Sequence, residues 1–231
     1  MKLRIRFAKI GRVRWTSHRD VARMWERALR RARVPIAYTE GFSPRPKLSF
    51  GLALPTGCES NAEYLDVALR EPLAPEEVTA NFSCLLPDGV DVVAAQVLPE
   101  GAGSLQEEVT SCRWEIDVPQ SDPDALSEII ARVLGAEVLS VTRERKGRPV
   151  TDDLRPSVLA LSSTGSCGTG AVLVAELGTR PRGVRPAELA QVMGIDLGLA
   201  RRTNQWIERD GSRWEPLATP AADAAVWERA S

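Results

Sequence analysis

Hydrophobic and polar positions alternate over residues 3–9 and then change to a helical period. The alternation predicts a strand with apolar residues on one face and charged residues on the other. Residues 13–16 are predicted as a short extension. A helix follows, with Ser17 as N-cap, Asp20 three residues later, and Pro35 as its end. Its expected buried stripe consists of Val21, Met24, Trp25, Ala28, Leu29 and Ala32.

The remaining pattern predicts the same order of elements twice. In the first half, strands 48–54 and 63–69, helix 75–86 and strand 90–97 follow the first helix. In the second half, the elements are strand 113–118, helix 121–134, strands 138–145, 158–162 and 171–177, helix 185–193 and strand 199–208, with extra chain at 146–157. Two βαββαβ units predict an α+β fold of two tandem ferredoxin-like domains with antiparallel sheets.

This order sets the predicted domain boundaries. They are a first domain at 1–98, a linker at 99–111, a second domain at 112–209 and a loosely held tail at 210–231. The chain is 43% hydrophobic, as in an ordinary globular protein, and it has no apolar run long enough to span a bilayer. Because residues 1–7 also lack a signal-peptide pattern, we expect a cytoplasmic protein with no membrane partner.

The four cysteines are far apart in the sequence and form no CxxC pair. A zinc ribbon or a self-held iron–sulfur cluster is therefore not expected, and we predict no cofactor. Asp152 and Asp153, followed by Arg155, fit either a salt-bridged loop or a pair of metal-seeking carboxylates.

Charge is segregated along the chain, and this changes the picture most. Residues 1–50 hold 14 Lys and Arg against 3 Asp and Glu, whereas residues 51–130 hold 2 against 16. The total is close to neutral, at −1. Such asymmetry creates a directed surface field and indicates an anionic partner more strongly than it indicates any reaction.

The candidate binding residues lie in and around the first helix. Its arginines follow helical spacing away from the buried stripe, and arginine suits bidentate phosphate contacts. Nucleic-acid readers also stack bases on exposed rings. Phe42 lies in a loop of glycine and proline and is expected to be exposed, whereas Trp15 is expected to pack under the helix. The predicted nucleic-acid-binding set is Arg12, Arg14, Arg19, Arg23, Arg27, Arg30, Arg31, Phe42, Arg45 and Lys47.

No catalytic set is predicted, since the sequence shows no Ser/His/Asp arrangement. The one candidate for an acid–base role is His18, the single histidine. It begins the first helix, where the dipole disfavours a charged imidazole, so we expect a neutral ring that makes one hydrogen bond and helps to fix the helix entrance.

Several motifs carry a resemblance to a known family. They are residues 17–20 (SHRD), 40–50 (EGFSPRPKLSF), 54–57 (LPTG), 59–60 (ES) and 62–64 (AEY), with a further echo at 143–146 and 153–156. The chain resembles the bacterial "radical SAM-linked protein" family, a domain of unknown function that occurs alone or fused behind B12-binding radical-SAM proteins. Arg19 stands where leucine is common in that family, and Arg45 stands where histidine is common. The resemblance implies a partnership with a radical-SAM enzyme.

Three functional hypotheses remain open at this point. The first is a non-catalytic RNA-binding adaptor that works with a radical-SAM enzyme in RNA modification or processing, with no preference for DNA inferred. The second is a metal-independent RNA-processing enzyme with His18 as the base. The third is a protein-interaction module whose basic face binds an acidic partner.

Overall fold

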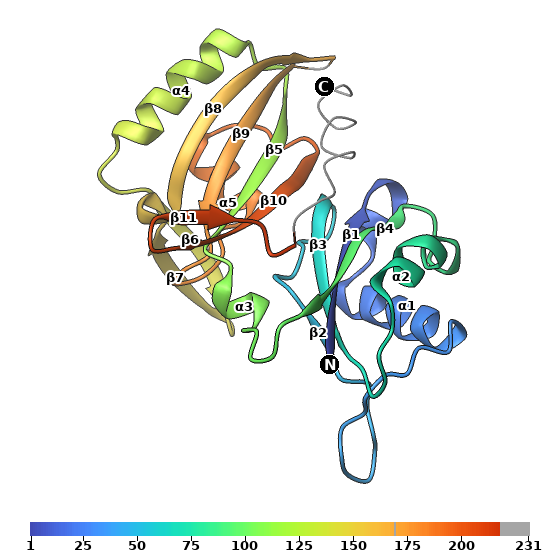
Figure 1. Cartoon of the computed structure of the whole chain (residues 1–231). Helices are drawn as coiled ribbons and strands as arrows, with labels where there is room; N and C mark the ends of the chain where they lie inside the picture. The colour runs from blue at the N-terminus through green and yellow to red at the C-terminus, as the bar shows by residue number, and fades with distance from the viewer. Residues whose placement is uncertain (169, 218–231) are drawn as a thin grey trace. The chain divides into compact units, whose positions relative to one another are not determined.

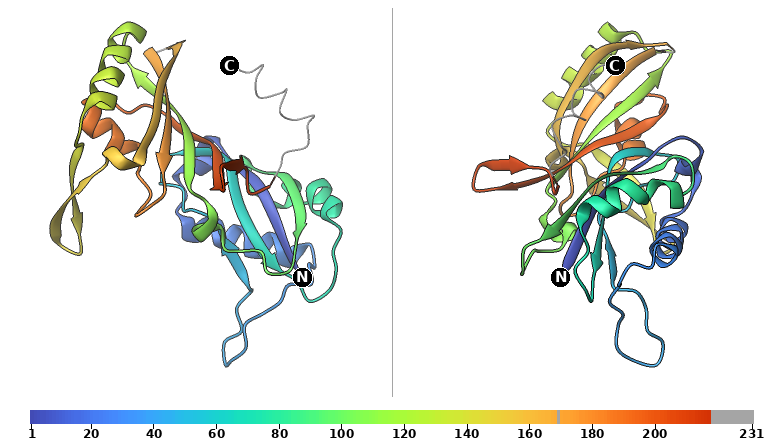
Figure 2. Two further views of the ribbon diagram at one scale, coloured as in Figure 1. Left: turned by 60° about the vertical axis from the view of Figure 1, so that its left-hand side comes forward. Right: turned by 45° about the vertical axis from the view of Figure 1, so that its right-hand side comes forward.

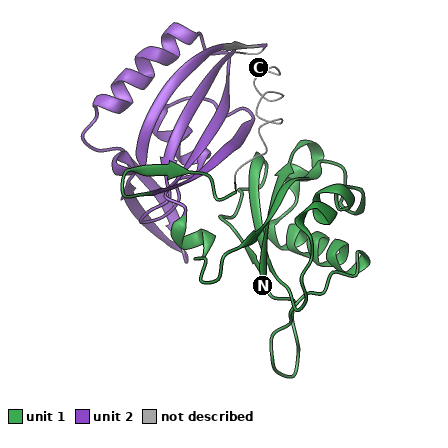
Figure 3. Cartoon of the chain, in the orientation of Figure 1, with its two compact units in different colours: residues 1–108, 209–231 green, residues 109–208 purple. Residues whose placement is uncertain are grey.

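The structure of the chain, a computed structural model, describes residues 1–168 and 170–217. The chain divides into unit 1, residues 1–108 and 209–231, and unit 2, residues 109–208 (Figures 1 and 3). Each unit combines helices with antiparallel strands, so the predicted α+β class is confirmed. Residues 218–231, which make up most of the predicted tail, lie outside the described residues. Within the described ranges, no helix has the length and hydrophobicity needed to cross a membrane.

Unit 1 is built on an antiparallel sheet with β1 between β3 and β4, and β2 also pairs with β3. Its elements are β1 Lys2–Lys9, the 3-10 helix η1 Gly11–Trp15, α1 His18–Arg31, β2 Leu48–Phe50, β3 Glu59–Ala68, α2 Pro75–Asn81, the 3-10 helix η2 Ser83–Leu85, β4 Val90–Leu98, α3 Leu105–Glu108 and β11 Ser212–Trp214. The short helix α3 lies inside the segment predicted as a linker, and Leu105 in it is buried.

The core of unit 1 lies between its sheet and the helices α1 and α2 (Figure 2). The predicted stripe of α1 is confirmed, with Val21, Trp25, Ala28 and Leu29 buried. Trp25 packs edge-on against Phe7 of β1, with ring centroids 5.0 Å apart. The apolar positions that alternate along β1 therefore form the surface on which α1 packs.

The other face of β1 is buried as well, although its side chains are charged. Arg4 forms a bidentate pair with Asp66 of β3, at 2.7 and 2.9 Å. Arg6 bonds Glu215 at 2.8 Å, and its guanidinium lies 5.9 Å from the centroid of the Tyr64 ring. Burying a charge is costly unless it is paired, so these carboxylates are what allow charged residues inside the unit.

Two local predictions in unit 1 are wrong. β2 is only three residues long instead of spanning 48–54, because the glycine at position 51 weakens a strand. Of residues 13–16 only Thr16 is extended, because residues 13–15 lie in η1, which begins at Gly11 with φ +69°.

Unit 2 has an antiparallel sheet with the strand order β10-β5-β9-β8. Its elements are β5 Ser111–Pro119, α4 Pro123–Gly135, β6 Ser140–Arg145, β7 Arg148–Asp153, the 3-10 helix η3 Arg155–Ser157, β8 Val158–Cys167, β9 Gly170–Gly178, α5 Pro186–Met193 and β10 Ala200–Arg209. The predicted strand 138–145 does not join this sheet. It forms β6, which pairs with β7 as a separate hairpin through a turn at Lys146 and Gly147.

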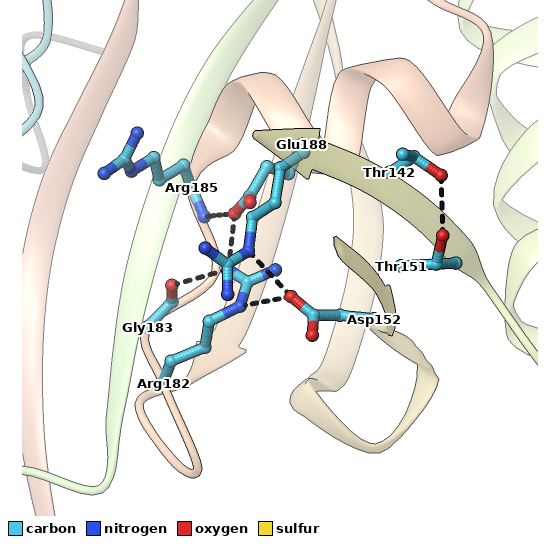
Figure 4. Close-up of polar contacts among 8 residues, drawn as sticks. Thr142, Thr151, Asp152, Arg182, Gly183, Arg185 and Glu188 are labelled. Atoms are coloured by element: carbon cyan, nitrogen blue, oxygen red, sulfur yellow. Dashed lines mark hydrogen bonds and ion pairs between the residues drawn. The ribbon is translucent and has the colours of Figure 1, made fainter. Parts of the chain in front are cut away.

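An ion-pair network fastens this hairpin to the start of α5 (Figure 4). Asp152 of β7 accepts from Arg143 at 2.7 Å and from Arg182 at 2.9 Å. Arg182 also bonds Glu188 of α5 at 2.8 Å. Asp153 accepts backbone N–H groups of Leu139 and Arg155 at 2.8 and 2.9 Å. The salt-bridged interpretation of the Asp152–Asp153 pair therefore fits the structure, since both carboxylates accept hydrogen bonds from residues of the chain.

We expect Trp25→Ala to lower the free energy of unfolding by about 3–5 kcal/mol, because it removes a fully buried ring from the core. The matched control is Trp15→Ala, whose ring is 64% exposed and which should cost less than about 1 kcal/mol. Urea denaturation of both variants measures the difference. Similar losses in the two variants would contradict the assigned core.

We expect Asp152→Asn to lower the thermal unfolding midpoint most near neutral pH. The hydrogen bond from Arg143 lowers the pKa of Asp152 below its ordinary value of 3.8. The ionised carboxylate thus stabilises the fold above the ordinary pKa, and that contribution disappears as the pH falls through the lowered value. The gap between variant and wild type should shrink below about pH 4. Glu128→Gln, at an exposed position of α4, is the control, and a gap that widens in acid would refute the pairing.

Candidate nucleic-acid interface

The start of α1 is fixed by its cap. The Ser17 hydroxyl oxygen accepts the backbone N–H of Asp20 at 3.2 Å, and the hydroxyl donates to the Asp20 carboxylate at 2.7 Å. This confirms the predicted N-cap and sets the rotation of the helix. With the apolar stripe facing the sheet, the arginines are left on the outer surface.

The outer surface of α1 carries a row of exposed arginines, and the group is Arg19, Arg23, Arg27, Arg30 and Arg31. Arg23 has an ion pair with Asp20 at 3.5 Å, and both side chains are at least half exposed. Such a surface pair contributes little. Among the described residues, the side chains of Arg19, Arg30 and Arg31 have no acidic partner. The row is therefore available to an anion from outside the chain.

The loop after α1 projects beyond the rest of unit 1 (Figures 1 and 2). Its base is closed by a bridge between Tyr38 and Pro46, and by backbone pairing of Thr39 with the carbonyl of Arg45 at 2.9 Å. Phe42 is completely exposed, as predicted, and the preceding glycine has φ +122°. Arg45 and Lys47 are also exposed. The loop thus presents an aromatic ring together with two cations.

The turn η1 differs from the predicted extension, and it leaves Arg12 more accessible than Arg14. Val13 points into the core, while Arg12 and Trp15 are exposed. The expectation that Trp15 packs under the helix is wrong, because Val13 is the residue of η1 whose side chain is buried in the core. Arg14 is less available than predicted, since it is half-buried and lies 3.4 Å from the buried Glu59 carboxylate.

His18 is the first residue of α1 and is exposed. Its ring packs edge-on against Phe50, with centroids 5.3 Å apart and planes at 81°. In the described part of the chain, the ring makes no hydrogen bond to another residue, so the predicted hydrogen bond is not found there. His18 also lines a small recess with Lys9, Glu63 and Tyr64. A general base is normally oriented by a hydrogen bond to a second polar group, and no described residue makes such a bond to the His18 ring.

Sequence reasoning missed two features of this surface. Trp15 is one, although its position directly after Arg14, in a segment that begins with Gly11, could have indicated an exposed ring. The buried Glu59 is the other, and it accepts the Gly11 N–H at 2.7 Å. The strand pattern alone could not identify its partner, because the two residues are 48 positions apart. Within the described ranges, no cluster of three His, Cys, Asp or Glu residues could hold a metal ion.

Comparison with known proteins places the chain in a family. No curated protein matches it. Residues 2–186, however, match the family described as "Uncharacterized protein conserved in bacteria (DUF2344)". Because this match covers most of the chain, including both the arginine row and the projecting loop, the protein belongs to that bacterial family.

Proposed function

We propose that the protein is a non-catalytic RNA-binding adaptor. The observation that carries the proposal is the row of exposed arginines on α1, whose one ion pair with a described residue is the weak surface pair of Arg23 with Asp20. Each arginine that neutralises a phosphate releases counterions, which gives affinity without base specificity. A row along one helix face matches a phosphate backbone better than it matches a single small anion.

The projecting loop supports RNA as the polyanion. Its exposed Phe42 offers a surface on which an unpaired base can stack, and the neighbouring prolines limit the entropy lost on binding. Unpaired bases are typical of RNA loops and single strands. An acidic protein partner would use the arginines equally well but would gain less from an isolated exposed ring.

We also propose that each unit is a ferredoxin-like βαββαβ domain. In unit 1, the strand order β4-β1-β3-β2 with intervening α1 and α2 supports this assignment. In unit 2, the order β10-β5-β9-β8 supports it in the same way, with the hairpin β6–β7 as an insertion between α4 and β8.

The proposed enzymatic partner is a radical-SAM protein, and the support for it is the sequence resemblance. The adaptor would hold an RNA while that enzyme modifies it. Co-purification of tagged protein from a bacterium that encodes both should recover the enzyme. Recovery of RNA without any radical-SAM protein would remove the partner but leave the RNA-binding proposal intact.

The two other hypotheses are outcomes of the same experiments. Cleavage of RNA by the wild-type protein, lost in His18→Asn, would favour the enzyme with His18 as base. Tight binding of an acidic protein but not of RNA would favour the protein-interaction module.

Replacing Arg23, Arg27 and Arg30 together by glutamate should abolish RNA binding, because all three cations are exposed on α1. For wild type, affinity should fall with salt by a slope of about 0.7–0.9 per phosphate contact. The matched control makes the same charge change at Arg70, Arg113 and Arg148, which are exposed elsewhere. Filter binding over a salt series measures both. Equal losses in the two triple variants would mean that net charge, not the α1 face, drives binding.

Phe42→Ala should weaken binding of single-stranded RNA by about 1–3 kcal/mol, the usual worth of one base stack. The unfolding temperature should stay unchanged, because the ring is fully exposed. Arg45→Ala should weaken binding too, and should reduce the salt slope by about one contact. Titration with labelled RNA and a thermal melt give both readouts. Unchanged affinity with a lower melting temperature would show that the ring serves the fold.

A further inference from the structure

Trp15 is a large apolar ring held 64% exposed among cations. Two other tryptophans, Trp25 and Trp114, are by contrast almost completely buried. Exposing an indole forfeits most of the free energy that its burial would supply. The exposed ring lies directly after Arg14 and three residues after Arg12, so its surroundings include two cations.

The position of the ring is fixed by the loop beneath it. A Cβ atom placed on Gly57 would come within 3.0 Å of the indole atom Cζ3, so the ring edge rests on that glycine. Gly57 also has φ +91°, and its N–H donates to the carbonyl of Arg14 at 2.9 Å. A ring that is already held in place loses little entropy when a ligand packs on it.

Two buried charges hold the turn that carries the ring. Lys9 donates to the carbonyls of Thr16 and Arg14 at 3.0 and 3.4 Å. Glu59 accepts the Gly11 N–H at 2.7 Å. A buried lysine and a buried glutamate bonded to one five-residue turn fix its backbone from both ends. These hydrogen bonds from two buried charges fix the backbone of η1, although Arg12 and Trp15 in it are exposed.

The cations around the ring select the ligand. In a 3-10 helix, residues three apart lie over one another, so Arg12 and Trp15 share one exposed side of η1. Arg14 places its guanidinium 5.4 Å from the ring centroid. A cationic ligand would be repelled here. A base with its phosphate is attracted, because the base stacks on the indole and Arg12 meets the phosphate.

We propose that Trp15 is a stacking site for a nucleobase of single-stranded RNA, with Arg12 as the phosphate contact beside it. The site lies on η1 and is additional to the arginine row and to the projecting loop. It rests on the proposed RNA-binding function, and it adds that the protein reads unpaired bases as well as phosphates at this position.

The test compares two oligomers of about 12 nucleotides, a usual length for one single-strand binding site. One is oligouridylate, and the other has the same phosphates but no bases. Trp15→Ala should bind oligouridylate about 5- to 150-fold more weakly, which corresponds to one lost stack. It should bind the abasic oligomer like wild type, with an unchanged salt slope. Trp15→Phe should keep most of the affinity, because it retains a ring.

The control is Trp214→Ala, which removes another partly exposed indole of unit 1 and should change neither affinity. Equal effects of Trp15→Ala on both oligomers, or no effect on either, would overturn the stacking site. Wild type that binds both oligomers equally well would overturn it too, while leaving phosphate binding intact. Wild type that binds neither oligomer would overturn the stacking site together with the proposed function.

Discussion

The need to pair charges buried on β1 is the constraint on which the rest of unit 1 depends. This strand is central and covered on both faces, yet it carries Arg4, Arg6 and Lys9 in buried positions. The buried residues of β3 include three acids, Glu59, Glu63 and Asp66. The bidentate pair of Arg4 with Asp66 ties the two strands in one register, because a one-residue slip would turn the carboxylate to the other face. The register that pairs β1 with β3 is therefore also the register that neutralises the buried Arg4.

The buried positions of β1 and β3 hold three cations and three acids, so their charges cancel. The basic surface of α1 therefore comes from its own exposed arginines. Among the described residues, the exposed cations on that helix have a single weak surface pair, Arg23 with Asp20. A chain of formal charge −1 can present a positive helix face because its basic residues are concentrated in residues 1–50. The same internal acids position the exposed aromatic residue, since Glu59 holds the turn that carries Trp15.

Unit 2 solves a related problem with a different device. Its hairpin β6–β7 does not join the main sheet, although Val141 of β6 is buried. The network of Asp152, Arg143, Arg182 and Glu188 connects it to α5 instead. Arg155 adds hydrogen bonds to the carbonyls of Leu134, Ala136 and Val158. Ion pairs thus fasten the inserted hairpin to α5, and Arg155 fastens the chain just after β7 to the end of α4 and the start of β8.

The sequence by itself determined those features that depend on neighbours a few residues apart. The cap and buried stripe of α1, the exposed Phe42 after Gly41 and the turn at Lys146 and Gly147 follow from local spacing and backbone preference. Only the tertiary structure decided which charges are buried and paired, because Arg4 meets Asp66 across 62 positions and Gly11 meets Glu59 across 48. It also decided that Trp15 faces outward and that β6 leaves the main sheet. Such outcomes depend on which segments, far apart in the sequence, occupy the same buried position, and the local pattern of hydrophobic and polar residues does not contain that information.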